Sequence, residues 1–356
     1  MKRIFTIVGA RPQFVKAAAV SRMLKKYGID EVLVHTGQHF DANMSTIFFE
    51  EMEIPKPQYN LHINGLTHGA MTGRMMEGLE QLLLSEQPDA VMVFGDTNST
   101  LAGALAAKKM NIPVIHVEAG LRSFNNKMPE EINRIITDRI ADILFCPTEN
   151  AVQNLKREGF DHFPVKIFKN GDVMQDVANY YAPKAAIKST IVEELGLTRF
   201  VLATIHRQEN TDDIQKLQQL MDGLNAVHHE MPVVMPLHPR TEQIIHQYHI
   251  RSKCLLIKPV GYFDMIRLLQ SCQLVITDSG GVQKEAFFFG KHCITLRDET
   301  EWVELVDHGF NTLTGADKTL LLAAYHAMKN KKSDFSLNLY GNGTAAEQIA
   351  QKLIEL

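Results

Sequence analysis

Short apolar runs recur along the chain, and each is followed by small or polar residues and then by a stretch with helical spacing. The runs predict strands, and apolar positions at i, i+3, i+4 and i+7 between them predict amphipathic helices. The predicted strands cover residues 4–8, 32–35, 90–94, 113–117, 143–146, 165–168, 200–205, 233–236, 255–258, 274–276 and 293–296. Strands that alternate with helices over short connections indicate an α/β protein with parallel, doubly wound sheets.

This alternating pattern occurs twice. Residues 173–197 have weaker periodicity and contain Pro183, so we place an interdomain linker there. The prediction is one Rossmann-like domain over residues 1–172 and a second over residues 173–339, followed by a last helix near residues 344–356. A chain of 356 residues is long enough for two such domains. Polar residues just after the strands of each half predict that the two domains face a cleft at the carboxyl ends of their strands.

Residues 274–285 combine a strand, a turn of small residues and a helix. The first N–H groups of such a helix are unpaired and carry the positive end of the helix dipole, which suits an anion. Gly280 and Gly281 allow a ligand oxygen to approach the backbone, and Glu285, one turn further on, can accept two ribose hydroxyls. Ser279-Gly280-Gly281 alone is equally compatible with a tight strand-to-helix turn.

Charged residues directly after apolar strands are expected to face the cleft. In the first half they include several carboxylates, and in the second half they are mainly basic, so we expect an acid/base centre opposite a diphosphate site. The first set is Arg11, Gln13, Lys16, Gln38, His39, Asp96, Glu118, Arg122, Glu130, Glu131 and Arg134. The second set is His206, Arg207, His238, Arg240, Ser279, Gly280, Gly281, Glu285, Arg297, Asp298 and Glu301.

Several of these residues have an ordinary structural alternative. Asp96 can be a helix N-cap, and the acids after Pro129 can be dipole partners of a helix N-terminus. Lys16 can be a lysine on a helix surface. Glu118 has no capping reason, which favours a site. His206 alone would be a simple hydrogen-bonded histidine, but beside Arg207 at a strand end it indicates a phosphate ligand or an acid.

Composition narrows the class of protein. The formal net charge of −4 gives no basic field for nucleic acid or an anionic membrane. No apolar stretch is long enough to cross a membrane and the start lacks a signal-peptide pattern, so we expect a cytoplasmic protein. The four cysteines lie in apolar surroundings without metal-site spacing and are expected to be buried free thiols. The histidines also show no metal-site spacing.

Six motifs in order along the chain resemble the non-hydrolysing UDP-N-acetylglucosamine 2-epimerases. They begin with Gly9-Ala10-Arg11-Pro12-Gln13-Phe14-Val15-Lys16, Gly95-Asp96-Thr97 and His116-Val117-Glu118-Ala119-Gly120-Leu121-Arg122. They continue with Pro129-Glu130-Glu131-Ile132-Asn133-Arg134, Asp278-Ser279-Gly280-Gly281 and Arg297-Asp298-Glu299-Thr300-Glu301. The resemblance covers essentially the whole chain.

The resemblance implies a fold like that of the GT-B glycosyltransferases, with the C-terminal helix (residues 340–356) crossing back to the first domain. It implies a homodimer and inversion at C2 of a UDP-sugar without NAD or metal, feeding cell-surface polysaccharide synthesis. By matching position, Asp96, Glu118 and Glu130 form the acid/base set, supported by Lys16, and His206 assists the leaving diphosphate. The residues that hold UDP by the same matching are Arg11, His238, Ser279, Gly280, Gly281 and Glu285.

Three positions depart from the best-known family members. Gln13 stands in place of Glu, Glu301-Trp302-Val303-Glu304 replaces Glu-Arg-Pro-Glu, and His39-Phe40-Asp41 differs from the segment that accompanies allosteric activation in some relatives. Together they resemble a subgroup acting on UDP-2,3-diacetamido-2,3-dideoxyglucuronate, since loss of a carboxylate favours an anionic sugar. The alternatives are a hydrolysing epimerase, a retaining glycosyltransferase and a non-catalytic UDP-sugar sensor.

Overall fold

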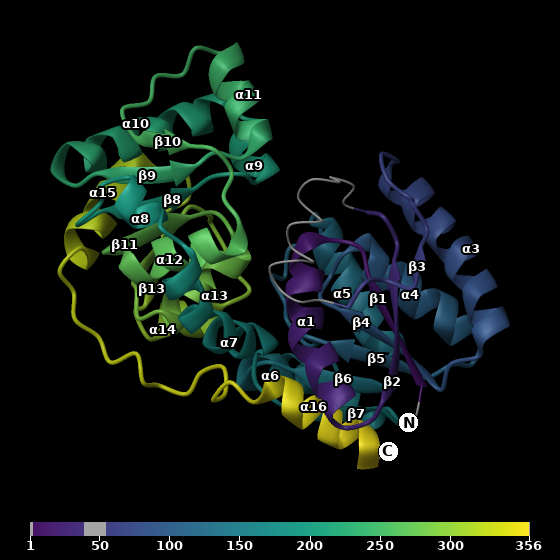
Figure 1. Ribbon diagram of the computed structural model, residues 1–356. Coiled ribbons are helices and arrows are strands. Elements are labelled where there is room, and N and C mark those ends of the chain that lie inside the picture. Colours follow the sequence, from purple (N-terminus) through teal and green to yellow (C-terminus); the bar gives the residue numbers. More distant parts are fainter. Residues whose placement is uncertain (1–2, 39–54, 356) are drawn as a thin grey trace. The chain divides into compact units, whose positions relative to one another are not determined.

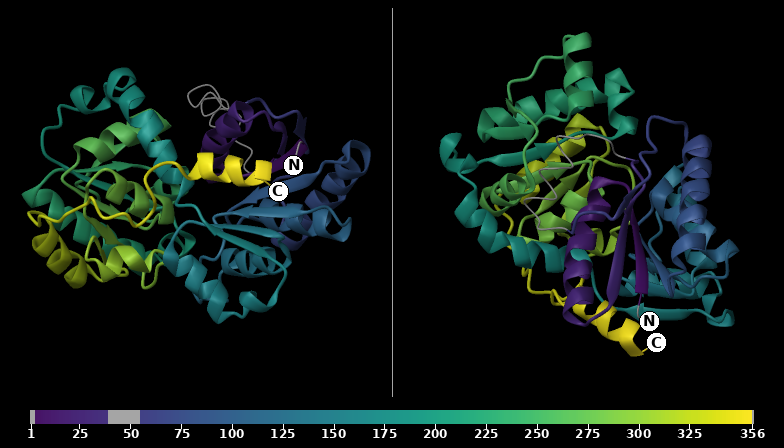
Figure 2. Two further views of the ribbon diagram at one scale, coloured as in Figure 1. Left: turned by 90° about the horizontal axis from the view of Figure 1, so that it is seen from below. Right: turned by 45° about the vertical axis from the view of Figure 1, so that its right-hand side comes forward.

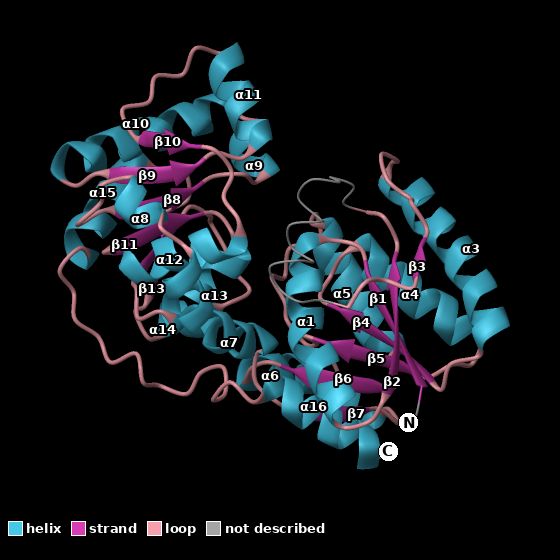
Figure 3. Cartoon of the chain, viewed as in Figure 1, coloured by secondary structure: helices cyan, strands magenta, loops and turns pink. Residues whose placement is uncertain are grey.

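The computed structural model describes residues 3–38 and 55–355. The side chain of Arg11 and all of His39 lie outside this description, so the predictions made for them are not followed further. The chain forms two compact units, one comprising Met1–Asn179 with Asn338–Leu356 and the other Tyr180–Leu337 (Figure 1). Each unit has a parallel β-sheet flanked by helices, as predicted (Figure 3).

The sheet of the first unit has the strand order β3-β2-β1-β4-β5-β6-β7, and every pairing is parallel. Its strands are β1 (Arg3–Val8), β2 (Asp30–His35), β3 (Tyr59–Asn60), β4 (Ala90–Phe94), β5 (Val114–Val117), β6 (Ile143–Cys146) and β7 (Lys166–Lys169). The connecting elements are α1 (Arg11–Lys26), α3 (His68–Glu86), α4 (Asn98–Lys109), α5 (Pro129–Ile140), α6 (Glu149–Arg157) and η1 (Phe160–His162). Because β4 is buried along its whole length, its apolar run does not alternate with polar residues.

The second sheet repeats this topology with the order β10-β9-β8-β11-β12-β13, again with parallel pairings. Its strands are β8 (Val201–Thr204), β9 (Val233–Pro236), β10 (Leu255–Ile257), β11 (Leu274–Thr277), β12 (Cys293–Thr295) and β13 (Asn311–Leu313). Its helices are α8 (Ile191–Glu194), α9 (Gln208–Thr211), α10 (Ile214–Glu230), α11 (Pro239–Gln247), α12 (Tyr262–Ser271), α13 (Gly280–Phe288), α14 (Val303–Asp307) and α15 (Lys318–Met328). Apolar residues of α10 and α15 pack on one face of the sheet, and those of α12 and α13 pack on the other.

The segment expected to be the interdomain linker, residues 173–197, contains the boundary between the two units, but it is largely helical. Residues Val173–Lys188 form helix α7, with Pro183 inside it, and the chain passes from the first unit to the second between Asn179 and Tyr180. The buried side chains of this helix include Val177, Tyr181 and Ala185, which keep helical spacing. Because polar residues and alanines dilute this stripe, its periodicity in the sequence is weak.

The last helix, α16 (Ala345–Glu355), belongs to the first unit and packs against α1 (Figure 2). Its first two N–H groups, on Ala345 and Ala346, donate to the carboxylate of Asp176 at 3.0 and 2.8 Å. Asp176 therefore caps a helix that is remote in sequence, which satisfies two otherwise unpaired donors. No helix in the described ranges is both long and apolar enough to cross a membrane.

Candidate active site

The strand order of the first unit reverses between β1 and β4, and ligands of doubly wound sheets bind beyond the strand ends at such a point. Gln13 joins these two strand ends. Its Oε1 accepts the N–H groups of Gly9 (2.8 Å) and Ala10 (3.0 Å), and its Nε2 donates to the Phe94 carbonyl (2.8 Å) and to Thr100 Oγ1 (3.0 Å). Both amide atoms of this buried side chain are thus used inside the unit.

Glu118 directly follows β5 and has a left-handed backbone, with φ of 72°. A non-glycine residue in this region costs roughly 1–3 kcal/mol, and such strain is concentrated at functional sites. Its carboxylate forms an ion pair with Lys16 from α1, and both side chains are 11% exposed. Lys16 is therefore not a surface lysine. The pair also lies against Gly95, where an added Cβ would stand 3.1 Å from Glu118 Oε2.

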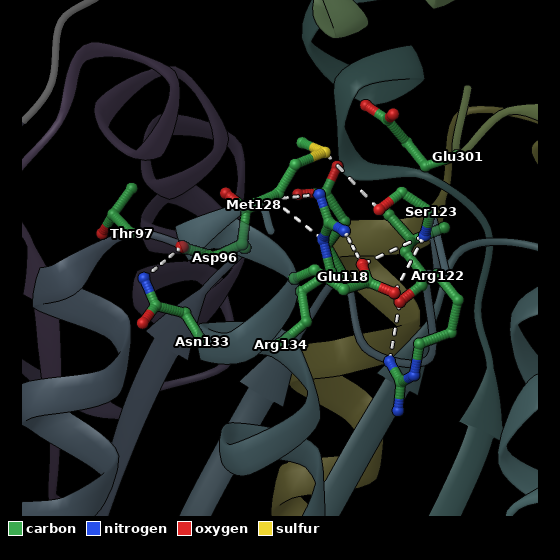
Figure 4. Close-up of polar contacts among 12 residues, drawn as sticks. Asp96, Thr97, Glu118, Arg122, Ser123, Met128, Asn133, Arg134 and Glu301 are labelled. Carbon is green, nitrogen blue, oxygen red and sulfur yellow. Dashed lines mark hydrogen bonds and ion pairs between the residues drawn. The ribbon is translucent and has the colours of Figure 1, made fainter. Parts of the chain in front are cut away.

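Asp96 lies in the turn that directly follows β4 and is held by α5. Its carboxylate accepts from Arg134 Nε at 2.9 Å and pairs with Arg134 Nη2 at 2.7 Å (Figure 4). Its backbone carbonyl accepts from Asn133 Nδ2 at 2.9 Å. The capping alternative does not apply, because Thr97 is the N-cap of α4 and its hydroxyl accepts the N–H of Thr100.

Two neighbouring acids at the start of α5, Glu130 and Glu131, differ in burial and in hydrogen bonding. Glu131 is buried, pairs with Arg134, and accepts the N–H groups of Ser123 (3.1 and 3.0 Å) and Phe124 (2.9 Å). It therefore anchors the loop that follows Glu118, a task beyond that of an ordinary dipole partner. Glu130 is exposed, and its side chain makes no hydrogen bond or ion pair with the part of the chain that the structure describes.

A buried polar network lies beneath these groups. Asp138 accepts from Arg122 Nη1 (2.7 Å) and from the Gly120 N–H (3.1 Å), and it contacts His116 Nδ1 at 2.7 Å. Burial raises the pKa of the Asp138 carboxyl, but the hydrogen bond and charge of His116 and the charge of Arg122 outweigh it and leave the pKa below its ordinary value. Arg122, predicted as a strand-end residue, is thus part of the interior.

In the second unit, one buried carboxylate organises the strand end at β8. Asp278, just after β11, accepts the backbone N–H groups of His206 (3.0 Å) and Arg207 (2.9 Å) and the Asn210 amide (3.1 Å). It also faces His206 Nδ1 at 3.1 Å, while the His206 side chain is 41% exposed. Burial raises the pKa of Asp278, but the His206 contact and these donors bring it below its ordinary value.

The N-terminus of α13 is formed as predicted, with Ser279 as its N-cap. Gly280 leaves no room for a side chain, because a Cβ there would stand 2.5 Å from Glu301 Oε1. Glu301 is fixed in turn by Arg297, whose Nη1 donates to it at 3.0 Å. A Cβ at Gly281, in contrast, would have only Ser279 Oγ nearby, at 4.0 Å.

The remaining second-unit residues lie on neighbouring elements. Glu285 is buried one turn into α13 and accepts from the Tyr262 hydroxyl at 3.1 Å. His238 is the exposed N-cap of α11, and its ring centroid lies 5.9 Å from that of His206. Its Nδ1 accepts the Arg240 N–H at 3.2 Å. The α13 N-terminus, Asp278 and His206 are therefore grouped at the ends of β8 and β11, which are adjacent strands.

Some predicted site residues lie in other surroundings than a strand-end site, and one residue of the site was not predicted. Gln38 is held inside the first unit, since its amide oxygen accepts from the N–H and Oγ of Ser99 at 3.1 and 2.7 Å. Asp298 is exposed and Arg207 is half-buried. Asp278 was not among the predicted site residues, although its position directly after a buried strand was a usable signal. Across residues 3–38 and 55–355, no cluster of three or more His, Cys, Asp or Glu side chains could hold a metal ion.

The fold and the two groups of strand-end residues define an α/β protein with two Rossmann-like units of the GT-B-like kind. The profile of the UDP-N-acetylglucosamine 2-epimerase family matches residues 22–354, and the chain belongs to this family. It is 53% identical, over 99% of this chain and 100% of the relative, to UDP-2,3-diacetamido-2,3-dideoxy-D-glucuronate 2-epimerase of Pseudomonas aeruginosa. It is 40% identical to UDP-N-acetylglucosamine 2-epimerase of Methanocaldococcus jannaschii, over 99% of this chain and 98% of that protein.

Solved structures agree with this assignment. The crystal structure of the Methanocaldococcus jannaschii UDP-GlcNAc 2-epimerase in complex with UDP-GlcNAc and UDP has a TM-score of 0.93 and 41% identity, with 100% of both chains covered. The Neisseria meningitidis UDP-GlcNAc 2-epimerase bound to UDP-GlcNAc has a TM-score of 0.89 and 28% identity, with 99% of this chain and 100% of that chain covered. The predicted family and fold class are thereby confirmed.

Proposed function

We propose that the protein is an isomerase that inverts C2 of a UDP-activated N-acetylated sugar without net hydrolysis. The observation that carries the proposal is the pair of carboxylates at adjacent strand ends, Asp96 after β4 and Glu118 after β5, each held by a cation. Loss of a C2 proton on one face and its return on the other requires acid/base groups, and positioned carboxylates supply them. Family membership supports the same reaction.

The proposed reaction has two steps. A carboxylate takes the C2 proton, a double bond forms between C1 and C2, and the bond from C1 to the UDP oxygen breaks with departure of UDP. UDP then returns to C1 while a proton is delivered to the other face of C2. Asp96, Glu118 and Glu130 form the proposed acid/base set, and Lys16 orients Glu118.

The second unit is proposed to hold UDP. The N–H groups of Gly280 and Gly281 have no partner in the part of the chain that the structure describes. Together with the nearby His206 they can stabilise the diphosphate as it departs, and Gly281 leaves space for its oxygens. Asp278 holds His206 in place through its Nδ1. Glu285 is proposed to accept the ribose hydroxyls. The further proposed substrate contacts are Gln38, Arg134, Arg207, His238, Ser279, Gly280, Arg297, Asp298 and Glu301.

The second candidate substrate is UDP-2,3-diacetamido-2,3-dideoxyglucuronate. The Pseudomonas aeruginosa relative that carries this name is 53% identical to the chain, whereas the Methanocaldococcus jannaschii relative named for UDP-N-acetylglucosamine is 40% identical. Gln13 also favours this anionic substrate, because its neutral amide stands where the best-known family members carry a carboxylate. We further propose a homodimer that works in the cytoplasm in polysaccharide synthesis; light scattering after gel filtration tests the dimer.

Proton NMR in D2O, with the two UDP-sugars in parallel tubes, tests the function. Deuterium at C2 together with an epimeric UDP-sugar supports the proposal, and the faster tube identifies the substrate. Free sugar with UDP would instead indicate a hydrolysing epimerase, and no change in either tube would favour a transferase or a sensor. Glu118→Gln should lower kcat by about 100- to 10,000-fold, as expected for loss of an acid or base. Glu77→Gln, on the exposed face of α3, is the matched control.

A further inference from the structure

His116 lies in the middle of β5 and has no exposed surface. Its two ring nitrogens face different groups at the same short distance, since Nδ1 lies 2.7 Å from Asp138 Oδ1 and Nε2 lies 2.7 Å from the Gly95 carbonyl oxygen. A carbonyl oxygen can only accept a hydrogen bond, and so can an ionised carboxylate. Both ring nitrogens therefore need a proton.

A neutral imidazole does not fit this arrangement. It carries one N–H and one lone pair, so one nitrogen would point its lone pair at an oxygen 2.7 Å away. Such a contact in a site without water leaves two buried acceptors facing each other, which is costly. The imidazolium form satisfies both contacts, provided that Asp138 is ionised.

The charges around His116 support this protonation state. Asp138 also accepts from Arg122, and Arg122 donates through Nε and Nη2 to the carboxylate of Glu158 at 2.7 and 2.8 Å. The imidazolium and the guanidinium thus balance the two carboxylates. On the neighbouring strand β6, the Cys146 thiol is buried and its pKa is raised well above its ordinary value by burial and by Asp138, so it adds no charge.

The same residue connects the two proposed reacting carboxylates. Gly95, whose carbonyl His116 holds, has φ of 61° and immediately precedes Asp96. Glu118 follows His116 by two residues, and Asp138 holds the Gly120 N–H beyond it. We propose that His116 is a buried, permanently protonated imidazolium that positions the Gly95-Asp96 turn and the segment bearing Glu118. The positioning role rests on the proposed function, whereas the protonation state does not.

The first test uses the wild-type protein labelled with ¹⁵N-histidine. Long-range proton–nitrogen correlation spectra should show both His116 nitrogens protonated and unchanged between about pH 6 and 9, the range in which ordinary histidines lose their charge. The resonance is identified by its absence in a His116 variant or by its slow exchange with solvent. A neutral tautomer, or titration within this range, would overturn the proposal whatever the protein's activity.

The second test separates the two hydrogen bonds. The amide nitrogen of Gln mimics Nε2 and can still reach the Gly95 carbonyl, whereas that of Asn mimics Nδ1 and can reach only Asp138. Positioning through Gly95 predicts that His116→Asn lowers kcat by about 100-fold, the effect expected when a reacting group moves by about 1 Å. His116→Gln should lower kcat by less than about 10-fold. KM and the affinity for UDP should be unchanged in both variants.

The control is His326→Gln on α15, where the side chain is 52% exposed. A wild-type kcat in a folded His116→Asn protein, or equal losses in both variants, would refute positioning through Gly95. If the wild type epimerises neither UDP-sugar, the proposed function fails, and the spectra of the labelled protein still decide the protonation state.

Discussion

Two of the three candidate carboxylates of the first unit are held by cations, each from a different helix. Lys16 of α1 pairs with Glu118, and Arg134 of α5 pairs with Asp96. A carboxylate that exchanges a proton with substrate must be oriented before the reaction, and an ion pair with a buried partner does this at a low cost in entropy. Glu130 has no such partner in the described ranges, so of the three it has the greatest freedom to move.

The two glycines at the start of α13 should respond oppositely to alanine. Gly280→Ala places a Cβ 2.5 Å from Glu301 Oε1, and Glu301 cannot retreat without losing Arg297, so we expect a loss of about 1–3 kcal/mol in the free energy of unfolding. Gly281→Ala has open space and gains helix propensity, so stability should be unchanged or up to about 1 kcal/mol higher. Guanidinium unfolding of the two variants measures this; equal losses would contradict it.

Gln13→Glu tests the amide that joins β1 to β4. A carboxylate still accepts from Gly9 and Ala10 but cannot donate to the Phe94 carbonyl, which would face it at about the present 2.8 Å. We expect a loss of about 1–3 kcal/mol in stability, the cost of a buried acceptor without its donor. Gln243→Glu, exposed on α11, should have no such effect in the same unfolding experiment. Wild-type stability of the Gln13 variant would show that the turn rearranges.

At the scale of elements, the sequence predicted the strands well because buried parallel strands are continuous apolar runs. Residues 90–94, 143–146 and 233–236 agree with β4, β6 and β9 to the residue. The misses are β3 and β13, two of the four edge strands. They have only two and three residues and are defined by a neighbouring strand more than by their own pattern. Helix α7 was missed because its buried stripe is diluted and because the helix contains Pro183.

The cap that Asp176 of α7 forms on α16 should be sensitive to pH. Burial, the largest cause, raises the pKa of this carboxyl from 3.8 to about 6. The native state therefore holds the proton more tightly than the unfolded state, so the contribution of Asp176 to stability is full below about pH 4 and is lost as pH rises through about 6. The pKa difference of about 2 corresponds to about 2–3 kcal/mol.

Denaturant unfolding of the wild type and Asp176→Asn at about pH 4.5 and 7.5 measures this dependence. The free energy of unfolding of the wild type, relative to that of the variant, should be higher at the lower pH by an amount approaching about 2–3 kcal/mol. Asp161→Asn, at an exposed aspartate in η1, should give a difference that does not vary in this way. A constant difference for Asp176→Asn would mean that its carboxyl titrates as an exposed one.

At the scale of the whole molecule, sequence reasoning found the strand-end groups and the cations Lys16 and Arg134 that pair with two of them, but it did not assign Asp138 and Asp278. Asp138 and Asp278 act on partners that the fold brings to them; Asp278 and His206, for example, are 72 positions apart. Their roles follow from the order of the strands and helices, which apolar periodicity does not specify. For Glu118, in contrast, the sequence was sufficient. It offers no helix cap that would explain this residue, which favours a site, and the left-handed backbone agrees with that interpretation.

The four cysteines are free and buried, as predicted, and they report on both units: Cys146 lies in the first, and Cys254, Cys272 and Cys293 lie in the second. Burial raises the pKa of Cys272 and Cys293 to about 12, so in the folded protein these thiols should resist alkylation. Pulsed alkylation along a guanidinium series, read by mass spectrometry, then follows the unfolding of each unit separately.

If the second unit holds UDP, as we propose, then UDP should protect its own thiols selectively. A ligand at about 100 times its Kd stabilises the state that binds it by about 2.7 kcal/mol. Cys272 and Cys293 should therefore become reactive at a higher guanidinium concentration with UDP than without it, while Cys146 should react at an unchanged concentration. Protection of Cys146 alone would place UDP on the first unit and refute the assignment, whereas equal protection of all three would mean that the two units unfold as one.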